Sequence, residues 1–435
     1  MDQNTKIIKE YYETEVVKEW NRIEGRPEFL LTCRMLEKYI KPGDSVLDIG
    51  GGPGRYSLCL AGKGCDVTLL DLSEGNTSFA AERAAEQGLS LRTVTGDARK
   101  AGRLAGGEYD HVLLMGPIYH LLEESDRIKA VESAIDALKP GGMIYVSFIN
   151  MFAGIVYSMK FQTDLIMSNE PDEIKYRANV VARKSYAGAA FTKAFFTEPT
   201  EILPFMGRFP LEKLHLFGQE SILSPNEDKI IGHSEEVTGA WLDFCEKIWE
   251  REDLLSWSEH IMYVGRSIVS PLPEIRSEIA DFNASDCTFN GFIDIPQLSD
   301  GEVFLICKGK HPANPTKRWV PGYEFAICAG HEKVGEISLR IGYTDSLYYG
   351  GHVGYGVDEA YRGKGYAVKA CRLLLPIARA HGMKKIFITN NVSNHASKRV
   401  CEKLRAKHLR LARLPEWHNL YHEGQRFINI FEWTV

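Results

Sequence analysis

The residues Val46-Leu47-Asp48-Ile49-Gly50-Gly51-Gly52-Pro53-Gly54 join an apolar run to a segment of helical character. The run at 45–49 predicts a buried strand, and the glycines after it let the backbone turn tightly and approach a ligand closely. The helix that follows offers free N–H groups and a partial positive charge. Asp71 ends a second apolar run about twenty residues later, where a carboxylate can accept hydrogen bonds from ribose hydroxyls. This stretch therefore predicts a nucleotide-like ligand at the edge of a sheet.

Apolar strands and helical segments alternate through the first third of the chain. A helical run over 5–40, ended by Pro42-Gly43, precedes them. Strands are predicted at 45–49, 67–71, 91–95, 110–115 and 143–149. Continuous apolar strands that alternate with helices are typical of an α/β fold with a doubly wound, Rossmann-like parallel sheet.

The pattern changes after Asn150. Residues 151–194 are predicted to form a helical cap inserted into the first domain, which spans 1–268 and ends with two closing strands. Prolines cluster near 270–278, so we expect a linker at 269–289 and a second domain at 290–435. The second domain is β-rich; its predicted elements are strands at 302–307, 323–342 and 349–357, a helix at 363–381, a strand at 385–389, a helix at 394–404 and two terminal strands.

Two kinds of nucleotide-binding fold place a glycine-rich loop between the first strand and its helix, and they differ in the spacing of the glycines. The dinucleotide fingerprint requires glycine or alanine at a position that Arg55 occupies here. The spacing Gly50, Gly52, Gly54 instead resembles motif I of class I S-adenosylmethionine-dependent methyltransferases. Further features similar to that family are Gly96-Asp97-Ala98 after the third strand, Asp110 at the start of the fourth, and Leu138-Lys139-Pro140-Gly141-Gly142 before the fifth.

The methyltransferase resemblance implies S-adenosylmethionine as cofactor and a role for each motif residue. The three glycines would line the methionine part of the cofactor, and Asp48 would organise the loop. Asp71, followed by Leu72, would bind the ribose. The remaining implied contacts are Asp97 and Ala98 at the adenine, and Met115 and Gly116 facing the transferred methyl group.

Methyl transfer needs little acid–base chemistry, because the sulfonium is already activated and alignment supplies much of the rate. A base helps where the acceptor must lose a proton. His120 is a candidate base, with packing at a helix start as the equal alternative. The segment Met115-Gly116-Pro117-Ile118-Tyr119-His120 lacks the Asn/Asp-Pro-Pro-Tyr pattern of enzymes that methylate nucleobase amines, which disfavours a nucleic-acid target. Tyr11 and Tyr12 are interpreted as core or lid residues.

The segment Tyr361-Arg362-Gly363-Lys364-Gly365-Tyr366-Ala367 follows a strand that ends at Val357 and opens a helix. It resembles the pyrophosphate loop of GNAT acetyltransferases, with Arg362, Gly365 and Ala367 at the motif positions. Backbone N–H groups at a helix start cradle phosphates. The resemblance implies acetyl-CoA as the second cofactor, bound by Val357, Arg362, Gly363, Lys364, Gly365, Tyr366 and Ala367, with Asn394 either holding the pantetheine arm or capping the last helix.

Two departures concern acetyl transfer itself. Cys401 stands where many GNAT relatives place a catalytic tyrosine, and residues 308–321 form a short link where relatives have two helices that shape the acceptor pocket. Candidate bases for an amine acceptor are Glu336 and His352, each with a structural role as the alternative.

The charge distribution, the cysteine content and the lack of long apolar stretches restrict the possible partners and location of the protein. Net charge is −6, yet fourteen Lys and Arg residues lie between Tyr361 and Arg413 against one acid, Glu402, which indicates a local anionic partner. Nine scattered cysteines without a CxxC pair indicate reduced thiols rather than disulfides or a metal site. A polar N-terminus and the lack of a long apolar stretch favour a cytoplasmic protein without a membrane span.

Three hypotheses follow, in this order. The first is a bifunctional enzyme that methylates and acetylates a small-molecule acceptor. The second is an enzyme that modifies RNA or the ribosome, which the basic stretch supports and the acidic remainder opposes. The third is a methyltransferase that carries a non-catalytic acetyl-CoA-binding module.

Overall fold

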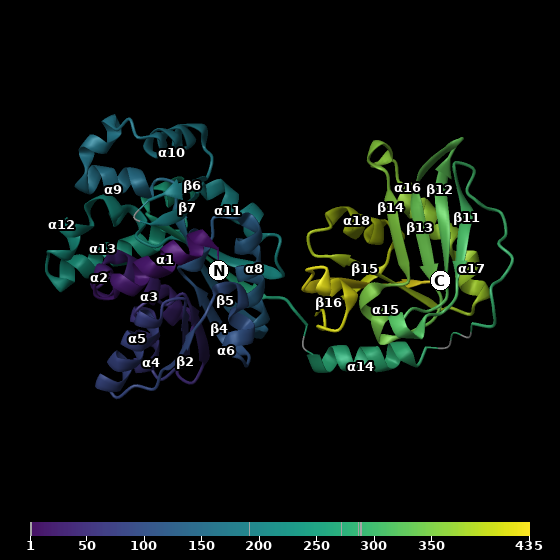
Figure 1. The fold of residues 1–435 in the computed structure, drawn as a ribbon, viewed down its shortest axis with the longest axis horizontal. Coiled ribbons are helices and arrows are strands. Elements are labelled where there is room, and N and C mark those ends of the chain that lie inside the picture. Colours follow the sequence, from purple (N-terminus) through teal and green to yellow (C-terminus); the bar gives the residue numbers. More distant parts are fainter. Residues whose placement is uncertain (1, 191, 271, 286, 288) are drawn as a thin grey trace. The chain divides into compact units, whose positions relative to one another are not determined.

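In the computed structural model, the residues described are 2–190, 192–270, 272–285, 287 and 289–435. The chain divides into two compact units, 1–268 and 269–435. The first is drawn in purple to teal and the second in green to yellow (Figure 1). Each unit is described by itself below.

The first unit is built on a mixed sheet whose central strands are parallel. The strands of the parallel part are β1 (Ser45–Ile49), β2 (Asp66–Asp71), β3 (Arg92–Thr95), β4 (Tyr109–Leu114) and β5 (Leu138–Asn150), in the spatial order β3-β2-β1-β4-β5. The switch from β1 to β4 reverses the strand order beside the glycine-rich loop, which is the place where open α/β sheets bind ligands. The predicted doubly wound, Rossmann-like sheet is confirmed.

Helices alternate with these strands and cover the sheet. They are α4 (Arg55–Gly62), α5 (Glu74–Glu86), α6 (Ala101–Ala105), α7 (Pro117–His120) and α8 (Glu124–Asp136). The predicted N-terminal helical run is divided into α1 (Gln3–Thr14), α2 (Val16–Arg22) and α3 (Pro27–Tyr39). Pro27 opens α3 because its missing N–H is not needed in the first helical turn.

The insertion after β5 contains strands as well as helices. Its helical part is α9 (Ala153–Phe161), the short η2 (Thr163–Met167) and α10 (Pro171–Ala182), and the hairpin β6 (Tyr186–Ala189) and β7 (Lys193–Thr197) then joins the main sheet beside β5. Helix α11 (Pro199–Met206) leads to β8 (Leu211–Gly218). The unit continues with η3 (Ser221–Asn226), α12 (Glu227–Ile231), α13 (Glu235–Ile248) and η4 (Glu252–Trp257), and closes with β9 (His260–Ser267), which pairs antiparallel with β5.

The segment expected to be a linker, 269–289, contains helix α14 (Leu272–Asn283). Ile275 and Phe282 of this helix are buried and pack in a core cluster of the second unit together with Tyr348 and Phe387. The segment is therefore folded onto the second unit over much of its length.

The second unit contains two antiparallel sheets. The larger is β10 (Leu298–Ser299), β11 (Val303–His311), β12 (Gly322–Ala329), β13 (Glu332–Arg340) and β14 (Val353–Val357), and the smaller is β15 (Lys385–Asn391), β17 (Phe427–Thr434) and β16 (Lys407–Arg413) in that spatial order. Helices α16 (Tyr366–Leu373), α17 (Leu375–Ala380) and α18 (His395–Leu404) follow β14 and β15. One hydrophobic core joins both sheets and these helices.

One predicted strand is shorter than expected. The sequence predicts a strand over 349–357, but α15 (Asp345–Gly350) covers its first residues and β14 begins only at Val353. The Thr344 side chain accepts a hydrogen bond from the Leu347 N–H and caps the helix, and Tyr348 and Tyr349 of this helix are buried.

Among the residues described, no helix combines the length and apolarity needed to cross a membrane.

Candidate functional site

The glycine-rich loop lies between β1 and α4 at the carboxyl edge of the first sheet. Gly50 has a φ of 75°, in the left-handed region, and a Cβ there would lie 2.4 Å from the Pro117 side chain. Any larger residue would push the loop away from the start of α7. Gly54, also left-handed, is the N-cap of α4.

The loop opens on a cavity with about 1190 Å³ of empty space, part of it open to solvent. Nearly all of the predicted methyltransferase residues meet at this cavity; those lining it are Asp48, Gly50, Gly52, Asp71, Leu72, Asp97, Ala98, Met115, Gly116 and His120. The predicted Gly54 acts instead through the helix cap. Further lining residues come from α1, α2 and α3, so the N-terminal helices close one side of the cavity.

Asp71 at the end of β2 holds the loop in place. Its carboxylate accepts hydrogen bonds from the backbone N–H groups of Gly52 and Ser73, both at 2.9 Å, and from the Asn76 side chain. Burial raises the pKa of Asp71. The carboxylate faces the cavity where the resemblance places ribose hydroxyls.

Asp48 carries a buried oxygen that has no partner in the part of the chain that the structure describes. Its Oδ2 accepts a hydrogen bond from the Ser57 hydroxyl at 2.7 Å, while Oδ1 is buried and unbonded. Burial raises the pKa of Asp48 to about 7. An unsatisfied buried acceptor is costly, so a ligand that donates a hydrogen bond here would be stabilised. This position fits the ammonium-bearing end of S-adenosylmethionine.

Asp97 and Ala98 line the cavity where a short 3-10 helix (Ala98–Lys100) begins, with Asp97 as its N-cap. The Asp97 carboxylate accepts from the Arg99 N–H at 2.9 Å and pairs with its guanidinium at 2.6 Å. The same guanidinium contacts Asp126 and approaches Asp2, which caps α1. Arg99 therefore ties the N-terminal helix to the predicted adenine end of the site.

His120 is buried and bonded at both ring nitrogens. Its Nδ1 donates to the Lys193 carbonyl at 3.0 Å, which leaves Nε2 as an acceptor for the Tyr12 hydroxyl at 2.7 Å. Burial lowers the pKa of His120 to about 4, so the ring is neutral at physiological pH. Tyr12 and His120 both line the cavity, and the partner of Nε2 is a side-chain hydroxyl rather than a backbone group.

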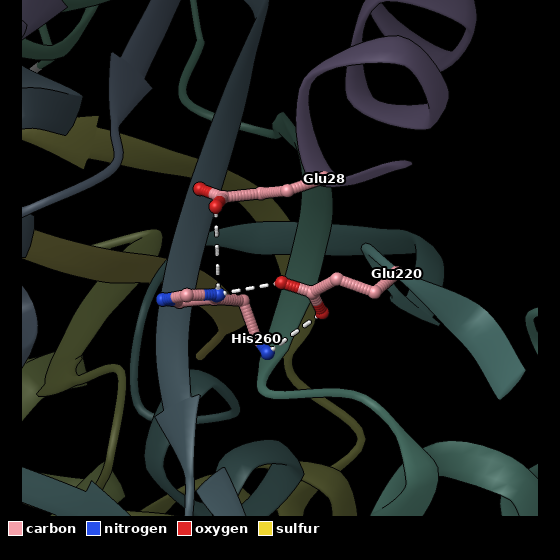
Figure 2. A group of neighbouring side chains, drawn as sticks. All are labelled: Glu28, Glu220 and His260. Carbon is pink, nitrogen blue, oxygen red and sulfur yellow. Dashed lines mark hydrogen bonds and ion pairs between the residues drawn. The ribbon is translucent and has the colours of Figure 1, made fainter. Parts of the chain in front are cut away.

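A group of acidic and basic side chains lies beside Tyr119, and Arg22 and Glu28 of this group line the cavity. Figure 2 shows Glu28 and Glu220 converging on the His260 ring: Nδ1 donates to Glu220 at 2.7 Å and lies 4.0 Å from Glu28. Arg22 pairs with Glu28 at 3.0 Å and with Glu19 at 3.0 Å. The two carboxylates raise the pKa of the half-buried His260 to about 9, although desolvation acts in the opposite direction, so the ring is charged. These ligand atoms are grouped closely enough for a metal ion, but Arg22 and the charged imidazole already balance Glu28 and Glu220.

The predicted coenzyme A loop forms the turn between β14 and α16 in the second unit. Gly365 is the N-cap of α16 with a φ of 83°, and no atom lies within 4 Å of a Cβ placed there. The first N–H groups of an α-helix have no intrahelical partners. Arg362, Gly363 and Lys364 are exposed beside them, Tyr366 and Ala367 begin the helix, and Val357 ends the preceding strand. This open, basic turn fits a pyrophosphate.

The strands β14 and β15, from different sheets, meet at one point. The His352 N–H donates to the Phe387 carbonyl at 2.7 Å, just before β14 begins. The His352 ring is fully buried, accepting from the Phe387 N–H at Nδ1 and donating to the Gly342 carbonyl at Nε2. Burial lowers its pKa to about 4. Because both ring nitrogens are bonded to backbone groups, the contacts of His352 are those of a structural residue rather than of a base.

The other predicted residues of this unit lie apart from one another. Glu336 is exposed on β13 and pairs with Lys333, whose ammonium lowers its pKa. Asn394 caps α18 by accepting from the Ser397 N–H at 3.0 Å. Cys401 is buried, and burial raises its pKa to about 12. The structure therefore brings together the residues of the loop, but not Glu336 and His352.

Sequence reasoning missed the partners that complete both sites. Tyr12 was interpreted as packing, yet its hydroxyl bonds to His120. Tyr355 of β14 bonds to the Ser397 hydroxyl of α18 at 2.9 Å and so joins the larger sheet to this helix. Arg22 lines the first cavity. The only sequence signal for Tyr12 was its place on a helix that often covers the cofactor in similar enzymes, because its partner is distant in the chain.

Two family matches cover the two sites. Residues 46–142 match the family described as methyltransferase domain, and residues 306–407 match the acetyltransferase (GNAT) domain family. The first match contains the glycine-rich loop and the second contains the turn at Gly365.

Curated relatives match the first unit. One is the ubiquinone biosynthesis O-methyltransferase of Caulobacter vibrioides, 36% identical over 108 residues, which are 25% of this chain and 42% of that protein. Its namesake in Cronobacter sakazakii is 27% identical over 176 residues, 40% of this chain and 65% of that protein. The matches thus span less than two thirds of each relative. A solved structure, magnesium protoporphyrin IX methyltransferase from Synechocystis, is 14% identical and covers 61% of this chain and 100% of its own, with a TM-score of 0.38.

The family matches agree with the local chemistry of each unit. The orphaned Asp48 oxygen and the Asp71 carboxylate suit S-adenosylmethionine, and the basic turn at Gly365 suits the phosphates of acetyl-CoA. The chain therefore carries a methyltransferase domain followed by a GNAT acetyltransferase domain.

Proposed function

We propose that this chain is a bifunctional transferase that methylates and acetylates small-molecule acceptors. The observation that carries the methyl-transfer part of the proposal is that the glycine-rich loop, Asp71 and Asp97 line one cavity with the Tyr12–His120 pair. Binding groups for a cofactor and a proton acceptor thus line one cavity. Such an arrangement suits a small acceptor, because helices α1 and α2 wall off one side of the cavity.

In methyl transfer, one group of cavity residues would bind the cofactor and another would remove the acceptor's proton. S-adenosylmethionine supplies an activated methyl group when bound. Asp48 would accept from its ammonium group and Asp71 from its ribose hydroxyls, which holds the methyl group in line with the acceptor. His120, fixed by the Lys193 carbonyl, keeps Nε2 as a base, and the Tyr12 hydroxyl can pass the acceptor's proton to it. An acceptor hydroxyl or amine would lose its proton by this route.

The second unit would supply the acetyl group from acetyl-CoA. The N–H groups at the start of α16, with Arg362 and Lys364, would bind the pyrophosphate. Asn394 would cap α18 beside the pantetheine arm, as the resemblance implies. Glu336, exposed and paired with Lys333, and His352, bonded at both nitrogens, are poorly placed to deprotonate an amine. The acetylation reaction would then rely on an acceptor amine that is already partly neutral.

One observation favours a second candidate function. Cys401 is buried with a raised pKa at the position where GNAT relatives place an acid, so it cannot readily protonate a leaving thiolate. Under this alternative the second unit binds acetyl-CoA without transferring the acetyl group, and the chain is a methyltransferase with a binding module.

Product assays separate these functions. The purified chain is incubated with S-adenosylmethionine and acetyl-CoA and a panel of small hydroxylated and amine compounds, while S-adenosylhomocysteine and free coenzyme A are measured. The proposal predicts that at least one compound releases each product. Acceptor-dependent S-adenosylhomocysteine without any release of coenzyme A would support the binding-module alternative. Activity on RNA alone would contradict the small-molecule assignment.

A further inference from the structure

Two cysteines from neighbouring helices lie side by side in the first unit. Cys33 on α3 and Cys59 on α4 have sulfur atoms 3.9 Å apart, and both side chains are partly exposed. Together with Tyr56 and Lys63 they line a narrow cleft that has no room for a water molecule. Access to the pair comes instead from the part of each cysteine residue that is exposed at the surface.

The surroundings make the two thiols unequal. The hydrogen bond between the two thiols lowers the pKa of Cys59 to about 7, and the Lys63 ammonium acts in the same direction. Lys63 follows Cys59 by one helical turn and is itself paired with Glu37. Hydrogen bonding to Cys59 and burial raise the pKa of Cys33. Because Lys63 stands one helical turn after Cys59, Cys59 is assigned as the thiol that attacks and Cys33 as the thiol that resolves.

From this geometry we infer that Cys33 and Cys59 form a reversible dithiol–disulfide site that controls cofactor binding. The oxidant is a small-molecule disulfide such as oxidised glutathione. The Cys59 thiolate attacks one of its sulfurs, forming a mixed disulfide and releasing one glutathione thiolate. The Cys33 sulfur then attacks Cys59 and releases the second. The protein loses two electrons and two protons, and the oxidised glutathione becomes two molecules of glutathione.

The link to the cofactor runs through α4. This helix starts at the end of the glycine-rich loop, and its residues Arg55 and Tyr56 line the cofactor cavity. Tyr56 lines the cysteine cleft as well. A disulfide needs sulfurs about 2.05 Å apart, so they must approach by nearly 2 Å. Because protein interiors are close-packed, a shift of α4 against α3 moves the walls of both spaces.

The experiment uses the full-length protein in buffers of varied ratio of reduced to oxidised glutathione. After alkylation of free thiols, mass spectrometry of peptides is expected to find Cys33 joined to Cys59, and reduction is expected to reverse it. Affinity for S-adenosylhomocysteine, measured on the same samples by calorimetry, is expected to fall about fivefold or more on oxidation. By linkage, saturating S-adenosylhomocysteine should make the disulfide harder to form by the same factor.

Matched variants separate the pair from the other cysteines. Cys59→Ser and Cys33→Ala should bind S-adenosylhomocysteine equally in both buffers, while Cys307→Ser, in the second unit, should behave as the wild type. The comparison of oxidised and reduced wild-type protein needs no variant, so a folding defect cannot hide the result. No Cys33–Cys59 disulfide under excess oxidised glutathione, or a disulfide with unchanged affinity, would overturn the inference. Failure of the reduced protein to bind S-adenosylhomocysteine would instead count against the methyltransferase assignment.

Discussion

His352 and Phe387 are joined by two hydrogen bonds that run in opposite directions. The backbone N–H of His352 donates to the Phe387 carbonyl at 2.7 Å, and the backbone N–H of Phe387 donates to the His352 ring at 2.8 Å. These bonds connect the two sheets of the second unit beside β14, just ahead of the predicted coenzyme A loop. The ring thus serves as a hydrogen-bond partner for the Phe387 N–H between β14 and β15, which belong to different sheets and do not pair with each other.

Replacing His352 with leucine is expected to destabilise the second unit by about 2–5 kcal/mol, because the Phe387 N–H and the Gly342 carbonyl would remain buried and unpaired. Denaturant unfolding of the full chain, followed by a probe in this unit, measures the loss. Glu336→Gln, at an exposed position, should change the free energy of unfolding by less than about 0.5 kcal/mol. A leucine variant that is as stable as the wild type but cannot transfer acetyl groups would point to a catalytic His352 instead.

The stability contributed by His352 should depend on pH. Burial lowers its folded pKa from 6.5 to about 4, so the unfolded chain binds the proton more tightly. The contribution is therefore fully present above pH 6.5 and is lost as the pH falls from there towards 4, by up to about 1.4 kcal/mol per pH unit. Comparison of wild type with His352→Gln across this window isolates the residue. A constant difference in unfolding free energy across the window would show that the ring is not held neutral.

Tyr12→Phe is expected to lower kcat for methyl transfer about a hundredfold, since it removes the hydroxyl that links an acceptor to His120. His120→Asn should lower it by at least as much. Calorimetric affinity for S-adenosylhomocysteine should stay within about twofold if the pair acts on the proton and not on the cofactor. The neighbouring Tyr11→Phe, whose hydroxyl faces Glu19, serves as the control and should keep its activity. Equal losses in both tyrosine variants would indicate a general effect on α1.

Arg362→Ala and Lys364→Ala should each weaken acetyl-CoA binding about tenfold, because each removes one positive charge beside the start of α16. The effect should shrink at high salt, as expected for exposed charges. Arg372→Ala removes a charge from the last turn of the same helix and should leave affinity nearly unchanged. If all three variants bind alike, the phosphates do not lie at this turn.

The sequence was most informative where chemistry depends on neighbours in the chain. The spacing of Gly50 and Gly52, and of Gly363 and Gly365, predicted both loops because backbone geometry leaves few alternatives to glycine there. Strand and helix alternation likewise predicted the parallel sheet. The contacts that make a catalytic group were not predictable in this way: Tyr12 and His120 are separated by 108 positions. The roles of His352 and of the segment around Phe282 depend on which surfaces pack, and periodicity alone does not reveal this.

The central claim is that one chain holds two separate cofactor sites, and calorimetric titration with S-adenosylhomocysteine and with acetyl-CoA tests it most directly. Gly52→Asp should abolish only the first binding event and Gly365→Asp only the second. Gly88→Asp and Gly382→Asp reproduce the left-handed backbone strain away from either site and should preserve both. The account predicts two ligands, each lost in its own variant. Failure of the wild-type chain to bind either ligand, or loss of both ligands in a single site variant that remains folded, would contradict it.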